Sequence, residues 1–395
     1  MKVERNEAAD LGPPPSLVEE AIGLAQKGDY HNAEARLYEL LEAAPEDLLG
    51  WITLAGVRGR GGDAAGEFEA IQKALAIDPY YVPGLLLKGN WYECRGNAVL
   101  AASSYTHALT VSPDEPYWPG QFHAELSHAK RYVEGHARGM SQHLHEKLAD
   151  LRSELESGDA ERWDEAVSIR AGLTQPYLSN SNQLYIPRLP AIPFFEREQF
   201  PFLGELEANT DVIRDEVAHA LSERQDGFAP YIAYRPGEPV NQWAHLNHSN
   251  DWNAFHLYKG GEPVEENLAS CPKTRALLES QPLCDLSGLC PNVFFSALAP
   301  NTHIPPHYGE SNARVIAHLP LIVPDNCGIR VGFEKREWEV GKALIFDDTL
   351  EHEAWNDSDE LRVVMIFDLW NPFLGEKGRT LASALAEATR SFSGS

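Results

Sequence analysis

Apolar and polar residues alternate along the last half of the chain with the period of two that is typical of β-strands. The alternation begins near residue 291 and continues to about residue 373, in short segments bounded by Gly, Pro, Asn or Asp. Six to eight short strands of this kind predict a sandwich or a barrel-like jelly roll. Helical periodicity precedes them at about 199–223 and again at 272–281, so we expect helices beside the sheets.

The first third of the chain repeats itself every 34 residues. Three glycines and three prolines recur at this spacing, namely Gly28, Gly62, Gly96, Pro45, Pro79 and Pro113. A period of 34 with small residues where two helices meet, and a proline where the second helix stops, is typical of tetratricopeptide repeats. We therefore place repeats at 14–47, 48–81 and 82–115, followed by capping helices to residue 157.

Three further segments complete the predicted organisation. Residues 1–13 are expected to form an N-terminal tail, and residues 158–395 a domain whose β core lies at about 291–373. Residues 172–202 contain five prolines and several aromatic residues, which indicates an ordered segment packed on a surface. The predicted fold class is α+β, with an all-α tetratricopeptide solenoid followed by a jelly roll, also called a double-stranded β-helix.

Composition limits the partners and the compartment. The chain has 33 Lys and Arg against 59 Asp and Glu, a net charge of −26. This argues against nucleic acid or an anionic membrane as a partner, because both need a cationic surface. The first residues lack the apolar core of a signal peptide, and no apolar run approaches the ~18–20 residues of a membrane helix. Five cysteines without CxxC spacing fit a reducing compartment, so we expect a cytoplasmic protein.

One set of residues in the strand region has the spacing of a metal site. His307 is followed by His352 after 45 residues and by Arg362 after a further ten. This spacing resembles that of the 2-oxoglutarate dioxygenases, in which a jelly roll brings two imidazoles to one Fe(II). There, an arginine pairs in bidentate fashion with a carboxylate of 2-oxoglutarate. The alternative is that these are ordinary surface or core histidines, which any β-rich protein contains.

The sequence around these residues resembles the aspartyl/asparaginyl β-hydroxylase family. The similarity covers roughly 185–373 and includes DWNAFHLY, HYGESNARVIAHLPLIVP and WEVGKALIFDDTLEHEAWNDSDELRVVMIFDLWNP. The resemblance implies an enzyme that uses Fe(II), 2-oxoglutarate and O2 and releases hydroxylated product, succinate and CO2. The vertebrate member of this family also has a tetratricopeptide domain before its oxygenase domain.

The resemblance also implies roles for single residues. His307 and His352 match the two iron ligands, and together with Arg362 they form the predicted catalytic set. Gly309 stands where the wider superfamily has a metal-binding carboxylate, and in this family water completes the iron shell. The residues that match the 2-oxoglutarate pocket are Trp252, Ser296, His318 and Arg362.

One position departs from the family pattern. Ile316 stands where the better-known members have an arginine that helps to hold a cosubstrate or substrate carboxylate. Arg314 lies two residues earlier, on the same face of its predicted strand. We therefore predict that Arg314 takes over the binding of the substrate.

The resemblance also raises the question of a disulfide. The vertebrate relative has one in a region comparable to Cys271 and Cys284, and its compartment is oxidising. The lack of a signal peptide in the sequence favours free thiols at both positions.

The predicted reaction is hydroxylation of an Asp or Asn side chain in a peptide or protein, which the tetratricopeptide groove could present. Two alternatives stay open. The same chemistry could act on a free or carrier-bound small molecule or on an acyl chain, which the change at Ile316 allows. The β-domain could also be inactive and the repeats a binding scaffold, although the presence of His307, His352 and Arg362 argues against it.

Overall fold

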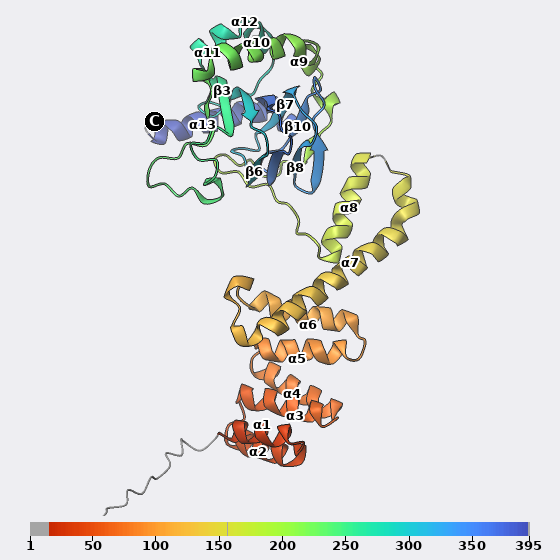
Figure 1. The fold of residues 1–395 in the computed structure, drawn as a ribbon. Helices are drawn as coiled ribbons and strands as arrows, with labels where there is room; N and C mark the ends of the chain where they lie inside the picture. The colour runs from red at the N-terminus through yellow and green to blue at the C-terminus, as the bar shows by residue number, and fades with distance from the viewer. Residues whose placement is uncertain (1–15, 156, 394–395) are drawn as a thin grey trace, which may run out of the picture. The chain divides into compact units, whose positions relative to one another are not determined.

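The computed structural model describes residues 16–155 and 157–393, and its contacts divide the chain into two compact units on either side of the Gln175–Pro176 bond. The first unit is helical and the second contains the β-sheets (Figure 1). The predicted tail at 1–13 lies outside the described residues. None of the helices within the described ranges is both long and apolar enough to cross a bilayer.

The first unit begins with three helix–turn–helix pairs, as the 34-residue period predicts. Their helices are α1 (Leu17–Gln26), α2 (Tyr30–Ala43), α3 (Leu48–Arg60), α4 (Ala64–Ile77), α5 (Val82–Glu93) and α6 (Ala98–Val111). The glycine that recurs every 34 residues lies in the turn of each pair with a positive φ, which residues with a Cβ rarely adopt. The Asp or Asn that follows each glycine accepts a backbone N–H and caps the second helix.

A single long helix, α7 (His123–Ser153), closes the repeats and buries Leu126 and Ala129. It is preceded by two short 3-10 turns at Glu115–Tyr117 and Gly120–Phe122. The next helix, α8 (Ser157–Ala171), packs against α7, where Nε of Arg152 lies 2.6 Å from Oδ1 of Asp164. Because of this packing, α8 belongs to the first unit, and the boundary falls after Gln175 and not at the expected residue 158.

Two antiparallel sheets form the second unit. The larger sheet has the order β1-β10-β7-β12-β5-β3-β2, with β4 beside β3, and the smaller has the order β6-β11-β8-β9. The strands are β1 (Phe194–Phe195), β2 (Ala229–Pro230), β3 (Trp252–Lys259), β4 (Glu262–Pro263), β5 (Val293–Leu298), β6 (Thr302–His307), β7 (Arg314–Ile322), β8 (Cys327–Val331), β9 (Glu334–Glu337), β10 (Leu344–Phe346), β11 (His352–Asn356) and β12 (Arg362–Trp370). The α+β fold class is confirmed.

The second unit differs from the prediction in two details. Strands β1 to β4 come before residue 291, where no strand was predicted. In β3 a register shift after His256 interrupts the alternation on which the prediction of strands rests. The predicted helix at 199–223 is two helices, α9 (Leu203–Ala208) and α10 (Thr210–Glu223). They meet at Asn209. Its N–H donates to the carbonyl of Leu206 in α9, and its carbonyl accepts the N–H of Ile213 in α10.

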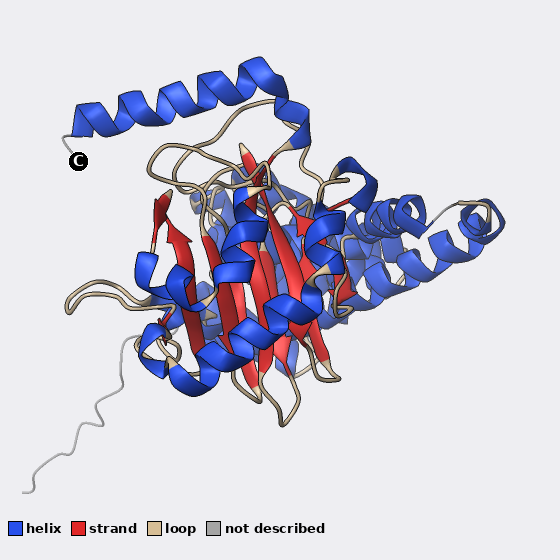
Figure 2. Cartoon of the chain, turned by 90° about the horizontal axis from the view of Figure 1, so that it is seen from above, coloured by secondary structure: helices blue, strands red, loops and turns tan. Residues whose placement is uncertain are grey.

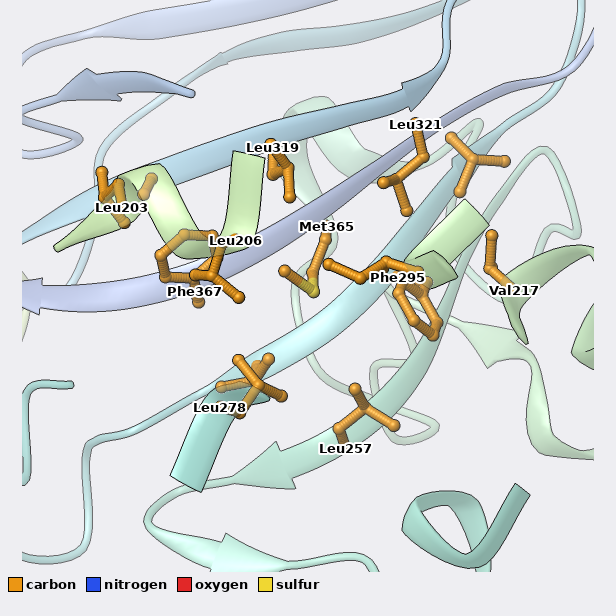
Figure 3. Close-up of a cluster of buried hydrophobic side chains, with 14 of the residues drawn as sticks. Leu203, Leu206, Val217, Leu257, Leu278, Phe295, Leu319, Leu321, Met365 and Phe367 are labelled. Atoms are coloured by element: carbon orange, nitrogen blue, oxygen red, sulfur yellow. The ribbon is translucent and has the colours of Figure 1, made fainter. Parts of the chain in front are cut away.

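Helices cover one face of the larger sheet, as Figure 2 shows. These are α9, α10, α11 (Glu265–Ser270) and α12 (Pro272–Glu279), while α13 (Gly375–Ser393) follows the last strand. Further 3-10 turns lie at Arg197–Gln199, Gln225–Gly227, Asn241–Trp243 and Pro372–Leu374. Figure 3 shows the core beneath the helices, where Leu206, Val217 and Leu278 surround Phe295 and Met365. Side chains alternate along each strand, so the neighbours of these core residues face the smaller sheet and line the site.

Candidate active site

His307 and His352 come together at one end of the smaller sheet. His307 ends β6 and His352 begins β11, the antiparallel register pairs them, and their ring centroids are 3.9 Å apart. Nδ1 of His307 lies 2.8 Å from the carbonyl oxygen of Pro305, and Nδ1 of His352 lies 3.0 Å from that of Leu350. A carbonyl only accepts, so each Nδ1–H donates and each Nε2 keeps its lone pair for a ligand.

Both imidazoles are neutral near pH 7. Burial lowers the pKa of His307 to about 3, and the neighbouring His352 adds to this shift. Burial likewise lowers the pKa of His352 to about 4. An imidazole must be deprotonated to bind a metal, so the pair offers two nitrogen ligands of a kind that suits Fe(II).

Gly309 allows a carboxylate to come close to the histidine pair. A Cβ at this position would lie 2.0 Å from Oδ2 of Asp348, so a larger residue would displace that carboxylate. Within residues 16–155 and 157–393, no group of three or more His, Cys, Asp or Glu side chains is arranged to hold a metal ion. His307 and His352 stay the predicted ligands of a metal ion.

Arg362 is buried with no ion-pair partner among the described residues. It is 1% exposed. Its Nη1 lies 3.4 Å from Oγ of Ser296, its guanidinium carbon lies 4.9 Å from the centre of the Trp338 ring, and its Nε has no hydrogen-bond partner. Burial lowers the pKa of Arg362 to about 10. A buried cation is costly unless an anion pairs with it, so this arginine fits a ligand carboxylate.

Three other predicted residues lie around Arg362. Ser296 is fully buried on β5, and its Oγ accepts the indole N–H of Trp252 from β3 at 3.1 Å. His318 on β7 is buried, and its Nδ1 has no hydrogen-bond partner. Burial and the charge of Arg362 hold the pKa of His318 well below its ordinary value. This end of the site therefore contains unused hydrogen-bonding groups beside an uncompensated positive charge.

A cavity of about 700 Å³ connects these side chains. Every residue predicted for the site lines it, namely Trp252, Ser296, His307, Arg314, His318, His352 and Arg362. Ile316 lines it too, together with Phe294 and Ile366, so its middle part is apolar. The alternation along the strands thus brings together residues that lie up to 110 positions apart in the sequence (252 to 362).

Arg314 is held in a way that differs from the prediction. Its Nη1 lies 2.9 Å from Oδ2 of Asp348, its Nε 3.2 Å from Oδ1 of Asp368, and its Nη2 3.6 Å from Oε2 of Glu310. Burial disfavours its charge, but these carboxylates outweigh burial and raise the pKa of Arg314 well above its ordinary value. The guanidinium is occupied by carboxylates of the protein itself, so this geometry does not support the predicted role of Arg314 in binding a substrate carboxylate.

The sequence reasoning missed several residues in and around the cavity, among them two tryptophans and an aspartate. Trp243 lies with its ring centroid 5.0 Å from that of His307, and Trp338 stacks beside His318 and Arg362. Both tryptophans lie outside the β-strands, so alternation carries no signal for them. Asp368 could have been found, because it continues the inward-facing series that starts at Arg362 on β12.

Several known proteins are similar to part of this chain. A family profile described as aspartyl/asparaginyl beta-hydroxylase matches residues 207–372. Mouse aspartate beta-hydroxylase domain-containing protein 2 is 30% identical over 249 residues, which cover 60% of this chain and 68% of that protein. Mouse aspartyl/asparaginyl beta-hydroxylase is 32% identical over 246 residues, and this chain spans 31% of its length. The ornithine lipid ester-linked acyl 2-hydroxylase of Rhizobium tropici is 34% identical over 197 residues, which cover 49% of this chain and 66% of that protein.

Proposed function

The chain belongs to the aspartyl/asparaginyl β-hydroxylase family, and we propose that it is an Fe(II)- and 2-oxoglutarate-dependent hydroxylase. One observation carries this proposal. A buried arginine with no ion-pair partner in the described chain lines the same cavity as two neutral histidines whose Nε2 atoms are free to bind a metal.

In this proposal, His307 and His352 hold Fe(II) through Nε2, and the Nδ1–H hydrogen bonds to backbone carbonyls fix the orientation of both rings. Bound Fe(II) and 2-oxoglutarate supply the activation of O2 that hydroxylation of a carbon requires. Arg362 pairs with the distal carboxylate of 2-oxoglutarate, and Ser296 positions the guanidinium. The aromatic and aliphatic walls exclude water from the reacting groups.

The first candidate substrate is an Asp or Asn side chain in a peptide or protein. The names of the mouse relatives support it, and the helical repeats could present an extended peptide. The second candidate is an acyl chain or another small molecule. Ile316, Phe294 and Ile366 favour it because they make the middle of the cavity apolar, and the Rhizobium relative is named for an acyl chain.

The experiment that tests the oxygenase proposal is anaerobic binding of Fe(II) and 2-oxoglutarate followed by visible absorption. We expect a weak charge-transfer band in the wild type and none in His307→Ala or His352→Ala. His303→Ala is the matched control. His303 lies on the same strand as His307 but outside the cavity lining, and its half-exposed ring is hydrogen-bonded to Glu353. Absence of the band in the wild type with both ligands in excess would contradict the proposal and favour an inactive scaffold.

Substrate choice requires a second experiment. Succinate release is measured with Fe(II) and 2-oxoglutarate in the presence of Asn peptides, Asp peptides and acyl compounds. Stimulation by peptides alone would support the first candidate, and stimulation by acyl compounds alone would support the second.

A further inference from the structure

Uncharged residues predominate at the opening of the cavity. Seven of the residues that line the cavity are exposed and therefore surround its opening, namely Asn180, Asn182, Tyr231, Gln242, Lys259, Pro306 and Tyr308. Lys259 is the one charged residue among these seven. Glu310, which is partly exposed, already pairs with Arg314 and accepts a hydrogen bond from the side chain of Gln183. The opening is therefore better suited to an uncharged group of a ligand than to a charged one.

Three side-chain amides at the opening have no hydrogen-bond partner among the described residues. Two of them, Asn180 and Asn182, belong to a segment whose backbone N–H groups donate to the carbonyls of Thr349 at 2.7 Å and Gly309 at 3.3 Å. They are two positions apart in an extended chain, so they lie on the same face of it. The third is Gln242, in a 3-10 turn of the connection between β2 and β3. Each of these amides offers both a donor and an acceptor to a ligand.

Aromatic rings line the wall between the opening and the histidine pair. Tyr231 stacks on Trp252 with ring centroids 4.2 Å apart, and Trp243 lies 6.0 Å from Trp252 and 5.0 Å from His307. Tyr231 and Trp243 stay partly exposed in the cavity. Neither the O–H of Tyr231 nor the indole N–H of Trp243 hydrogen-bonds to another described residue. The wall therefore offers ring faces and two further polar groups to a ligand.

The connection between β2 and β3 is fixed at its base before any ligand binds. The N–H of His248 donates to the carbonyl of Ile232 at 2.8 Å, and the N–H of Tyr234 donates to Oδ1 of Asn247 at 2.9 Å. Leu246 anchors the same connection in the core and is 1% exposed. Side chains that are already in place lose less conformational entropy when a ligand binds, so weak neutral contacts add to affinity.

We infer that Gln242 and Trp243, with Asn180 and Asn182 beside them, determine specificity by binding planar, uncharged amide groups of the substrate. The inference rests on the proposed function, which assigns the histidine pair to Fe(II) and Arg362 to 2-oxoglutarate. An amide both donates to and accepts from the side-chain amides, and its N–H can also lie against the ring of Trp243. In a peptide, these groups are the main-chain amides next to the target residue. An acyl chain has no such groups along its length, so the opening favours the first candidate substrate.

The test compares two tripeptides on the full chain loaded with Mn(II) and 2-oxoglutarate without O2. Acetyl-Ala-Asn-Ala-methylamide ends in uncharged amides, whereas Ala-Asn-Ala has the same side chains and charged termini. By NMR titration we expect the blocked tripeptide to bind about tenfold more tightly than the charged one.

Two variants assign the preference to the proposed residues. Gln242→Ala should weaken binding of the blocked tripeptide about fivefold, as expected for one neutral hydrogen bond, and Trp243→Ala about tenfold. Gln225→Ala and Trp163→Ala are the matched controls and should leave this affinity unchanged, because both residues are exposed and outside the cavity lining. The affinity for 2-oxoglutarate should be the same in all four variants, which separates a local effect from a loss of structure.

Equal affinities for the two tripeptides, tighter binding of the charged one, or no binding of the blocked one would overturn the inference. Unchanged affinity for the blocked tripeptide in both Gln242→Ala and Trp243→Ala would overturn it as well. Binding of 2-oxoglutarate to the wild type is measured in the same samples. If 2-oxoglutarate binds and the preference for the blocked tripeptide is absent, only the inference fails. If 2-oxoglutarate does not bind, the proposed function fails.

Discussion

Two buried arginines lie at the two ends of one cavity. One is paired with carboxylates of the chain, and the other has no ion pair among the described residues. Each is the first residue of a strand in the larger sheet, Arg314 of β7 and Arg362 of β12, and each is less than 5% exposed. Arg314 has three carboxylates of the chain within 3.6 Å, and its pKa is well above the ordinary value. Arg362 has no ion pair among the described residues, and burial lowers its pKa to about 10.

The difference teaches how to separate a structural arginine from a ligand-binding one. A cation that the protein neutralises by itself stabilises the fold and has little left to offer a ligand. A cation that is buried without a counter-ion costs stability, and it is useful only if an anion arrives to pair with it. The two arginines should therefore respond to the same substitution with opposite signs.

The largest effect is expected for Arg314→Met. The substitution leaves Asp348, Asp368 and Glu310 without their cation, so the free energy of unfolding should fall by ~3–5 kcal/mol. Urea denaturation measures it. Arg275→Met is the control, because the ion pairs of Arg275 are exposed and should contribute ~1 kcal/mol or less. If the free energy of unfolding falls no more for Arg314→Met than for Arg275→Met, the distinction between Arg314 as a structural arginine and Arg362 as a ligand-binding one is wrong.

The next effect is the loss of 2-oxoglutarate binding in Arg362→Met. Removal of one partner of a buried, hydrogen-bonded ion pair costs ~2–5 kcal/mol, so the Kd for 2-oxoglutarate should rise about 100-fold. The affinity for Fe(II) should change little, since Arg362 is not one of the proposed ligands. Without 2-oxoglutarate this variant should be at least as stable as the wild type. Equal losses of metal and 2-oxoglutarate affinity would count against the role of Arg362.

Much of this site could be predicted from the sequence, because the alternation of residues along a β-strand indicates which side chains share a face. His318 and Ser296 fall on inward positions of strands whose outward positions, such as Leu319 and Phe295, are buried under helices. Their proposed roles in binding 2-oxoglutarate stay predictions. The helical repeats could be predicted equally well, because a period of 34 residues can be recognised without knowing which distant segments are in contact.

The state of Arg314 could not be predicted, because its partners come from three separate segments. Glu310 follows β6, Asp348 lies in the turn before β11, and Asp368 is on β12. Alternation tells which face a side chain occupies but not which groups from other segments reach it. The same limit applies to Trp338, which contacts Arg362 from a connection outside the strands.

Addition of 2-oxoglutarate should stabilise the wild-type protein, because it pairs with Arg362. With 2-oxoglutarate at about 100 times its Kd, the free energy of unfolding should rise by ~2.7 kcal/mol, since only the native state offers Arg362 as a partner. Thermal or urea unfolding with and without 2-oxoglutarate measures the difference. Arg362→Met, with its Kd about 100-fold higher, should be stabilised by only ~0.4 kcal/mol at the same concentration. Stabilisation of the wild-type size in this variant would mean that 2-oxoglutarate pairs elsewhere.

The smallest effect is expected for Ser296→Ala, which tests whether Arg362 is positioned as well as buried. Oγ of Ser296 is 3.4 Å from Nη1 of Arg362 and also accepts the indole N–H of Trp252. At 3.4 Å the hydrogen bond from the charged guanidinium is long, so we expect it to contribute only ~1 kcal/mol, and the KM for 2-oxoglutarate should rise about fivefold while kcat changes less. Ser222→Ala, on the exposed end of α10, should leave both constants unchanged. An equal fall in kcat with an unchanged KM would mean that Ser296 acts on a step after binding, and Arg362 would then hold its position through the stacked ring of Trp338 alone.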